Sequence, residues 1–193
     1  MKLSAVFIDR DGVLNEEADY LSDPKKLSLI HGAADAIYSL NTQTVSVIVV
    51  SNQSGVARGY FLESQIKVVE VALEKELAEQ GAHIDGWYYC PHLSEGSVAE
   101  YAIECDCRKP KPGLLIRAAQ ERGIELVDAV MIGDKASDIA AGHAVGARTI
   151  LVRTGQGERE WAGWREEFKP SYVAKDLADA VQWLLSVERE GAH

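Results

Sequence analysis

Six short apolar segments, separated by longer stretches of helical periodicity, constrain the fold of this chain more than any other feature. Most of the segments are continuously apolar rather than alternating, which is typical of parallel strands buried on both faces of a sheet. We therefore predict strands over residues 5–8, 45–51, 86–90, 129–133 and 148–152, and a weaker strand over 171–174.

Helical patterns fill the gaps between these strands, over residues 32–41, 62–80, 113–122, 136–145 and 177–189. In the clearest pattern, Ile66, Val69 and Leu73 recur at helical spacing, and Gly81 follows as a stop. Asp176 is placed to cap the last helix. Strands that alternate with helices predict an α/β fold, a Rossmann-like three-layer sandwich around a mainly parallel sheet.

The length of the chain limits the number of domains. With 193 residues the chain suits one domain with a sizeable core. The gaps between the predicted strands are too short to hold a large cap domain. We therefore predict a single domain over residues 1–193.

A formal net charge of −10 argues against a nucleic-acid partner. No apolar run approaches the roughly 20 residues that a membrane-spanning helix needs. The N-terminal segment also has too short an apolar stretch for a signal peptide. We expect a cytoplasmic monomer that binds a small molecule, with neither nucleic acid nor a membrane as a partner.

Carboxylates follow two of the predicted strands. In "VFIDRDGVLN", Asp9 and Asp11 come directly after the first strand, and Asp134 follows the strand over 129–133. Because ligands of an open α/β sheet bind outside the carboxyl ends of its strands, adjacent strands would bring these groups together. Aspartates also cap helices and turns, but three converging carboxylates would repel each other unless a cation such as Mg²⁺ lay among them.

The spacing of Asp9 and Asp11 also makes a geometric prediction. If the two alternate as residues at a strand end do, both side chains point to the same side of the sheet. Arg10 would then point away, and its replacement should reduce activity far less than replacement of either aspartate.

Two loops carry the residue types that bind phosphate. The segment "SNQSGVARG" follows a strand with small and polar residues, and "CRKPKPG" concentrates positive charge within an acidic protein. Ordinary polar loops and solvated charge runs have similar compositions, but the prolines and the place of "CRKPKPG" just before a helix favour a phosphate clamp. The candidate substrate contacts are Asn52, Gln53, Arg58, Arg108, Lys111 and Lys135.

Three cysteines and a histidine lie within one segment of 18 residues. Cys90 and His92 are followed, after twelve residues, by Cys105 and Cys107. Three thiolates and an imidazole make a closed tetrahedral zinc set, whereas the alternative is three reduced cysteines and a surface histidine. With no position left for water, the zinc would be structural and would hold a loop over about 90–107.

Taken together, the motifs resemble those of the haloacid dehalogenase-like (HAD) phosphatases: D-x-D-G after the first strand, Ser after the second, a downstream Lys, then G-D-K-x-x-D. The resemblance implies a HAD-like fold and a phosphoric monoester hydrolase. It implies that Asp9 is the nucleophile and Asp11 the general acid and base, and that Ser51 and Lys109 hold the phosphoryl oxygens. It further implies Mg²⁺ bound by Asp9, the main-chain carbonyl of Asp11, and Asp134.

The cysteine-rich loop narrows this resemblance to two groups within the family. One hydrolyses the 7-phosphate of D-glycero-D-manno-heptose 1,7-bisphosphate in nucleotide-activated heptose biosynthesis, and the other hydrolyses histidinol phosphate. The segments "SNQSGVARGYF", "WYYCPH" and "CDCRKPKPG" look most like the first group. Histidinol phosphate or another small sugar phosphate remains an alternative substrate, and a phosphomutase or a non-catalytic protein on the same fold remains an alternative class.

Overall fold

The structure, a computed structural model, describes residues 3–165 and 168–190. Its six strands are all parallel and form one sheet in the order β3-β2-β1-β4-β5-β6. The strands are β1 (Ala5–Ile8), β2 (Ser46–Asn52), β3 (Gly86–Cys90), β4 (Ala129–Gly133), β5 (Arg148–Val152) and β6 (Tyr172–Ala174).

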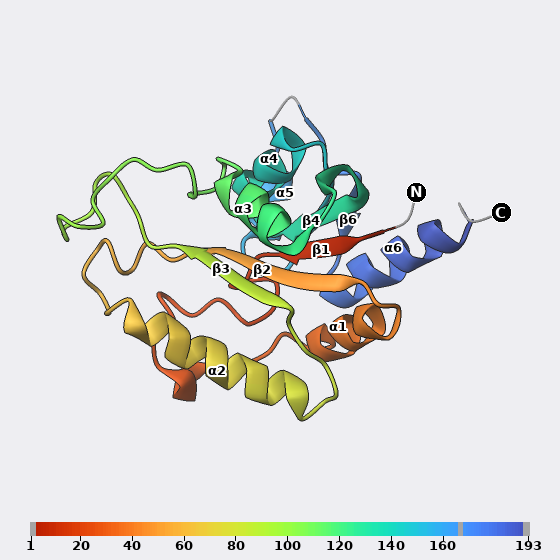
Figure 1. Ribbon diagram of the computed structural model, residues 1–193, viewed down its shortest axis with the longest axis horizontal. Coiled ribbons are helices and arrows are strands. Elements are labelled where there is room, and N and C mark those ends of the chain that lie inside the picture. The colour runs from red at the N-terminus through yellow and green to blue at the C-terminus, as the bar shows by residue number, and fades with distance from the viewer. Residues whose placement is uncertain (1–2, 166–167, 191–193) are drawn as a thin grey trace.

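Helices cover both faces of this sheet (Figure 1). They are α1 (Ala33–Thr42), α2 (Ser64–Ala78), α3 (Gly113–Arg122), α4 (Ala136–Ala144), α5 (Gly157–Ala162) and α6 (Leu177–Glu190), together with short 3-10 helices η1 (Pro24–Lys26) and η2 (Leu126–Asp128). Helices α1, α2 and α6 lie on one face, and α3 and α4 lie on the other (Figure 1). The predicted three-layer α/β sandwich is confirmed.

Alternate side chains of the central strand enter different halves of the core. Val6 and Ile8 pack with α1, α2 and α6, whereas Ala5 and Phe7 pack with α3 and α4. Because both faces of β1 are covered, all four of its residues are buried, which explains why the strand reads as a continuous apolar run.

The predicted bounds of the six strands and five helices agree with the structure to within two residues at every end. Asp176 caps α6 as predicted, since its Oδ1 accepts a hydrogen bond of 2.8 Å from the main-chain nitrogen of Asp179. The segment "EREWAGWREEF" indicates an amphipathic helix, but the six residues of α5 are too few for their period to fix its bounds.

Each connection between neighbouring strands in the described ranges holds one α-helix at most beside loops and 3-10 turns, so no cap domain is inserted there. Within those ranges no helix is long and apolar enough to cross a membrane.

Candidate functional site

The strand order places the predicted catalytic groups at one edge of the sheet. Strand β1 lies between β2 and β4, so Asp9, Ser51 and Asp134 emerge from three adjacent strands. The chain winds outward from β1 to β3 on one side and from β4 to β6 on the other. The groups therefore lie at the topological switch point, where an open α/β sheet binds its ligands.

Two lysines lie beside Asp9, the buried Lys109 and the partly exposed Lys135. The Nζ of Lys109 lies 3.0 Å from Oδ1 of Asp9 and 2.7 Å from Oδ1 of Asp138, and the Nζ of Lys135 lies 3.8 Å from Oδ2 of Asp9. Burial raises the pKa of Asp9, but the ammonium groups of Lys109 and Lys135 outweigh it and bring the pKa below the ordinary value. Asp9 is therefore an ionised carboxylate, as a nucleophile must be.

Asp134 and Asp138 lie close to Asp9, and the nearby lysines do not balance the charge of all three carboxylates. Burial and the neighbouring Asp9 carboxylate raise the pKa of Asp134 to about 7, and burial also raises the pKa of Asp138. One carboxylate oxygen from each of Asp9, Asp134 and Asp138 lies within 4.8 Å of the others. Three carboxylates facing two ammonium groups leave one unbalanced negative charge in a buried place. The donor set of hard oxygens therefore fits a divalent cation such as Mg²⁺.

Two glycines close tightly around Asp134. Gly12 has a φ of 86°, and a side chain there would meet Oδ2 of Asp134 at 2.4 Å. A side chain on Gly155 would meet the same oxygen at 2.3 Å. Glycine is needed at position 12 both for the positive φ of the turn and for the carboxylate that lies beneath it.

The main chain of Lys109 is held by a side chain that we had assigned to the substrate. Asn52 donates from Nδ2 to the carbonyl of Lys109 at 3.0 Å and accepts from its N–H at 3.1 Å. The ammonium group of Lys109 also donates to the carbonyl of Val50 at 2.6 Å. Asn52, the last residue of β2, therefore positions Lys109, which lies 57 residues further along the sequence.

Asp11 faces a separate set of donors. The guanidinium of Arg10 donates from Nε and Nη2 to Oδ1 at 3.2 and 3.0 Å, and from Nη2 to Oδ2 at 2.8 Å. Asn15 adds a third donor to Oδ1 at 3.0 Å. Gln53 donates from Nε2 to Oδ2 of Asp11 at 2.9 Å and to Oγ of Ser51 at 2.7 Å.

This geometry corrects one expectation. We expected Arg10 to point away from both aspartates, and for Asp11 this is wrong. The chain turns at Gly12, and the long side chain of Arg10 folds onto the neighbouring carboxylate instead of following the alternation of a strand.

A cavity of about 560 Å³ opens above these groups. Eight of the predicted residues line it: Asp9, Asp11, Ser51, Asn52, Gln53, Arg108, Lys109 and Lys135. Asp134 is fully buried beneath. Arg58 and Lys111 lie outside the lining, because Arg58 lies over the ring of Tyr20, 6.0 Å from its centroid, and the exposed Lys111 pairs with Asp106.

Sequence reasoning missed several residues of the site, four of them on long loops. Glu17, Asp19 and Tyr20 line the cavity from the long loop after β1, and Gln156 lines it from the loop after β5. The main-chain nitrogen of Gln156 donates to Oδ2 of Asp134 at 2.9 Å. The one signal that could have found them is length, because both loops are long stretches without periodicity.

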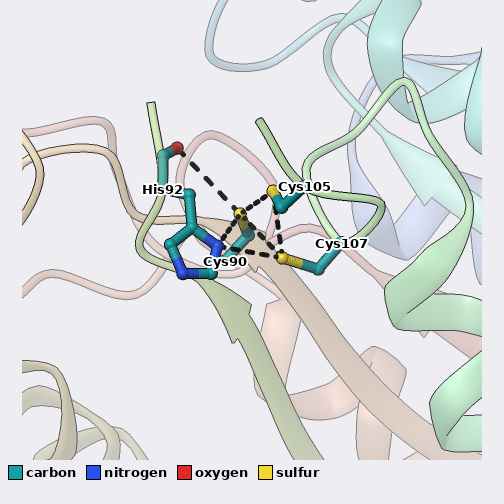
Figure 2. A group of neighbouring side chains, drawn as sticks. All are labelled: Cys90, His92, Cys105 and Cys107. Atoms are coloured by element: carbon teal, nitrogen blue, oxygen red, sulfur yellow. Dashed lines mark hydrogen bonds between the residues drawn. The ribbon is translucent and has the colours of Figure 1, made fainter. Parts of the chain in front are cut away.

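The predicted zinc ligands converge at the carboxyl end of β3. Figure 2 shows Cys90, His92, Cys105 and Cys107 pointing toward one another. The Sγ atoms of the cysteines are 3.1 to 3.5 Å apart, too far for a disulfide. Nδ1 of His92 lies 3.3 Å from Sγ of Cys107. One ligand atom from each residue lies within 4.8 Å of the others, and this soft donor set fits a tetrahedral zinc ion.

The cysteine-rich loop also reaches the cavity. Arg108 directly follows Cys107, and its Nη1 donates to the main-chain carbonyl of His92 at 3.2 Å. A second anchor lies on α2's N-terminal side, where Glu63 accepts hydrogen bonds from the hydroxyls of Tyr101 at 2.9 Å and Tyr89 at 3.1 Å. The loop is thus held at the cysteine cluster and at Glu63, and the main-chain nitrogen of Val98 also donates to the carbonyl of Ala57 at 2.9 Å.

Known proteins are similar to this chain over most of its length. The family model described as HAD-hydrolase-like matches residues 106–180. The D-glycero-beta-D-manno-heptose-1,7-bisphosphate 7-phosphatase of Vibrio cholerae is 38% identical over 190 residues, which cover 98% of this chain and 100% of that protein. The D-glycero-D-manno-heptose-1,7-bisphosphate 7-phosphatase of Thermosynechococcus vestitus is 42% identical over 189 residues, covering 95% of this chain and 96% of the relative.

A solved structure extends the likeness to three dimensions. The crystal structure of D,D-heptose 1,7-bisphosphate phosphatase from B. bronchiseptica, complexed with magnesium and phosphate, superposes with a TM-score of 0.84 at 30% sequence identity. The match covers 95% of this chain and 99% of that one.

Proposed function

Because this chain belongs to the HAD-like hydrolase family, alongside relatives named heptose bisphosphate 7-phosphatases, we propose that it hydrolyses the 7-phosphate of D-glycero-D-manno-heptose 1,7-bisphosphate. It would thereby act in the synthesis of nucleotide-activated heptose. The observation that carries the chemistry is the placement of Asp9, an ionised carboxylate at the end of the central strand between two lysines.

In the first half of the reaction, a carboxylate oxygen of Asp9 attacks the phosphorus of the 7-phosphate. The bond between phosphorus and the sugar oxygen breaks, and Asp11 gives a proton to that leaving oxygen. Lys109 and Ser51 hold the oxygens of the transferring group, so that the charge that spreads over them is neutralised where it develops.

In the second half, Asp11 takes a proton from water, and the water oxygen attacks the phosphorus of the aspartyl-phosphate. The acyl-phosphate bond breaks, which restores Asp9 and releases inorganic phosphate. Dividing hydrolysis in this way replaces one difficult displacement with two easier ones.

Two metals belong to this proposal. Mg²⁺ would be held by Asp9, Asp134 and the main-chain carbonyl of Asp11, and when bound it neutralises charge on the phosphoryl oxygens. Zinc would be held by the three cysteines and His92 and would be structural, since four protein ligands leave no position for water.

Arg108 is our candidate for the second, non-reacting phosphate of the substrate. It is half-buried, lines the cavity, and is tied to the loop through the carbonyl of His92. A guanidinium can donate two parallel hydrogen bonds to a phosphate, which a solvated lysine does less specifically.

The test is phosphate release from a panel of substrates, with Mg²⁺ and with EDTA. We expect heptose 1,7-bisphosphate to be turned over with the highest kcat/KM, with heptose 1-phosphate and inorganic phosphate as products identified by phosphorus NMR. A higher kcat/KM for histidinol phosphate would overturn the substrate, and transfer of the phosphate to a second sugar would indicate a phosphomutase. Activity unchanged in EDTA would overturn the magnesium site.

A further inference from the structure

Arg10 is the largest side chain that is fully buried, and the mechanism above does not use it. It lies between the two catalytic aspartates and is 2% exposed. Burying a charged group is unfavourable unless the charge is paired and hydrogen-bonded. The hydrogen-bond partners of the Arg10 guanidinium therefore indicate its role.

Most of the polar capacity of this guanidinium goes to one carboxylate. Nε and Nη2 both donate to Asp11, whereas Nη1 finds no hydrogen-bond partner among the residues that the structure describes. A second buried carboxylate, Glu70 of α2, pairs with the exposed Lys67 at 3.3 Å rather than with Arg10. A buried ion pair adds little stability over apolar residues of similar volume, so stability alone does not account for this pairing.

The two carboxylate oxygens of Asp11 accept hydrogen bonds from different sets of donors. Oδ1 accepts from Nε and Nη2 of Arg10 and from Asn15, which fills its capacity. Oδ2 accepts from Arg10 and from Gln53, and Gln53 also reaches Ser51, one of the residues proposed to hold the phosphoryl group. Oδ2 is thus the oxygen on the side of the reacting group, and the planar fork of Arg10 sets this orientation.

We infer that Arg10 is a positioning residue for the proton transfers of Asp11, holding the carboxylate from behind so that Oδ2 faces the leaving group. This inference rests on the proposed function, because it requires Asp11 to act as the general acid. It predicts a specific defect. Loss of the fork should impair departure of poor leaving groups, which need a proton, and should spare good ones, which do not.

The experiment compares kcat/KM on two substrates for four proteins: wild type, Arg10→Lys, Asp11→Asn and Arg148→Lys. Lysine keeps the charge and most of the stem but cannot bond both oxygens as a fork. Arg148 pairs with Glu188 away from the site and serves as the matched control. The substrates are heptose 1,7-bisphosphate, which loses an alkoxide, and p-nitrophenyl phosphate, which loses a stable phenolate. The value of kcat/KM isolates the steps up to phosphoryl transfer.

We expect Arg10→Lys to lose about 10- to 100-fold on the bisphosphate, part of the roughly 10²- to 10⁴-fold that general acid catalysis contributes, and under about threefold on p-nitrophenyl phosphate. The ratio of kcat/KM on the bisphosphate to kcat/KM on p-nitrophenyl phosphate is the deciding quantity. A misfolded, inactive fraction lowers both values equally and therefore does not change this ratio. Equal losses on both substrates, or no loss on either, would overturn the inference. If Asp11→Asn loses activity equally on both substrates, Asp11 is not the general acid and the proposed mechanism is wrong. If only Arg10→Lys loses activity equally on both, the inference about Arg10 is wrong and the proposed function stands.

Discussion

At the scale of single residues, Asp9 and Asp11 stand two positions apart yet meet different partners. Asp9 contacts Lys109 and Lys135, whereas Asp11 contacts Arg10 and Gln53. Their mutual repulsion is therefore offset by separate cations. This separation suits two different tasks, because a nucleophile needs a stable negative charge and a general acid must exchange a proton.

The Asp9→Asn variant tests the nucleophile. An amide cannot attack phosphorus, so we expect kcat to fall at least about 10³-fold, with the circular dichroism spectrum unchanged. The matched control is Asp35→Asn at an exposed position of α1, which should keep wild-type turnover. Substantial activity in Asp9→Asn, confirmed in a preparation free of wild-type enzyme, would remove Asp9 from the nucleophile role.

The Asp134→Asn variant tests whether the buried carboxylate of Asp134, close to that of Asp9, destabilises the metal-free protein. In the metal-free protein the pKa of Asp134 is raised from 3.8 to about 7 by burial and by Asp9. The folded state thus binds a proton that the unfolded chain has released, so wild-type stability falls as pH rises between these two values. Above about pH 8 the variant should be more stable than metal-free wild type by about 2 kcal/mol, roughly 4 to 8 °C in Tm.

Thermal melts in EDTA at about pH 8 and about pH 5 provide this measurement. At the lower pH the advantage of the variant should shrink, because wild-type Asp134 is then protonated in the folded state. Added Mg²⁺ should raise the Tm of wild type and leave that of the variant nearly unchanged. If the variant were less stable than wild type at the higher pH, repulsion between Asp134 and Asp9 would not be destabilising the metal-free protein.

Site residues could be predicted from the sequence where the adjacent segment of the chain has a recognisable secondary structure. Asp9, Asp11 and Asp134 could be predicted because each follows a recognisable strand, and adjacent parallel strands bring their ends together. Arg10 and Gln156 could not, because their partners depend on how loops fold back in space. The role of Asn52 was also hidden, since nothing in the sequence ties it to a main chain 57 residues away.

At the scale of elements, strands and helices were easier to predict than loops. The apolar runs and helical periods gave all six strands and five helices, but α5 and the 3-10 turns are too short to carry a period. The three longest loops, which build much of the site, follow no periodic rule. Their shapes come from specific contacts, such as the hydrogen bond of 2.6 Å from Oγ1 of Thr154 to the carbonyl of Gly12.

The Glu63→Ala variant tests the second anchor of the cysteine-rich loop. Without the carboxylate, the hydroxyls of Tyr89 and Tyr101 lose their acceptor, and the loop keeps the cysteine cluster and the main-chain hydrogen bond from Val98 to Ala57. Amide hydrogen exchange over residues 93–104 should accelerate on the order of tenfold while zinc content stays constant. The exposed Glu100 of the same loop supplies the control, since Glu100→Ala should exchange like wild type. Loss of zinc in Glu63→Ala would show that the two anchors are not independent.

At the scale of the whole molecule, the sheet ends in two different edges. Strand β3 carries the cysteine-rich loop at one edge, and β6 forms the other edge, with four strands between them. One core cluster nevertheless spans this width, with Trp87 of β3 and Trp183 of α6 both packed against it. A continuous core predicts that the two edges unfold together, as a single domain over residues 1–193 would.

The four tryptophans allow this prediction to be tested with probes at opposite edges. One variant keeps Trp87 alone and the other keeps Trp183 alone, the latter stacked on Tyr172 of β6 with ring centroids 4.6 Å apart. The remaining tryptophans become phenylalanine. In urea, with Mg²⁺ and Zn²⁺ present, the fluorescence midpoint of each variant should coincide with its own midpoint by circular dichroism, because coincident transitions mark two-state unfolding. An earlier fluorescence transition in the Trp87 variant would mean that the β3 edge and its loop form a separate cooperative unit.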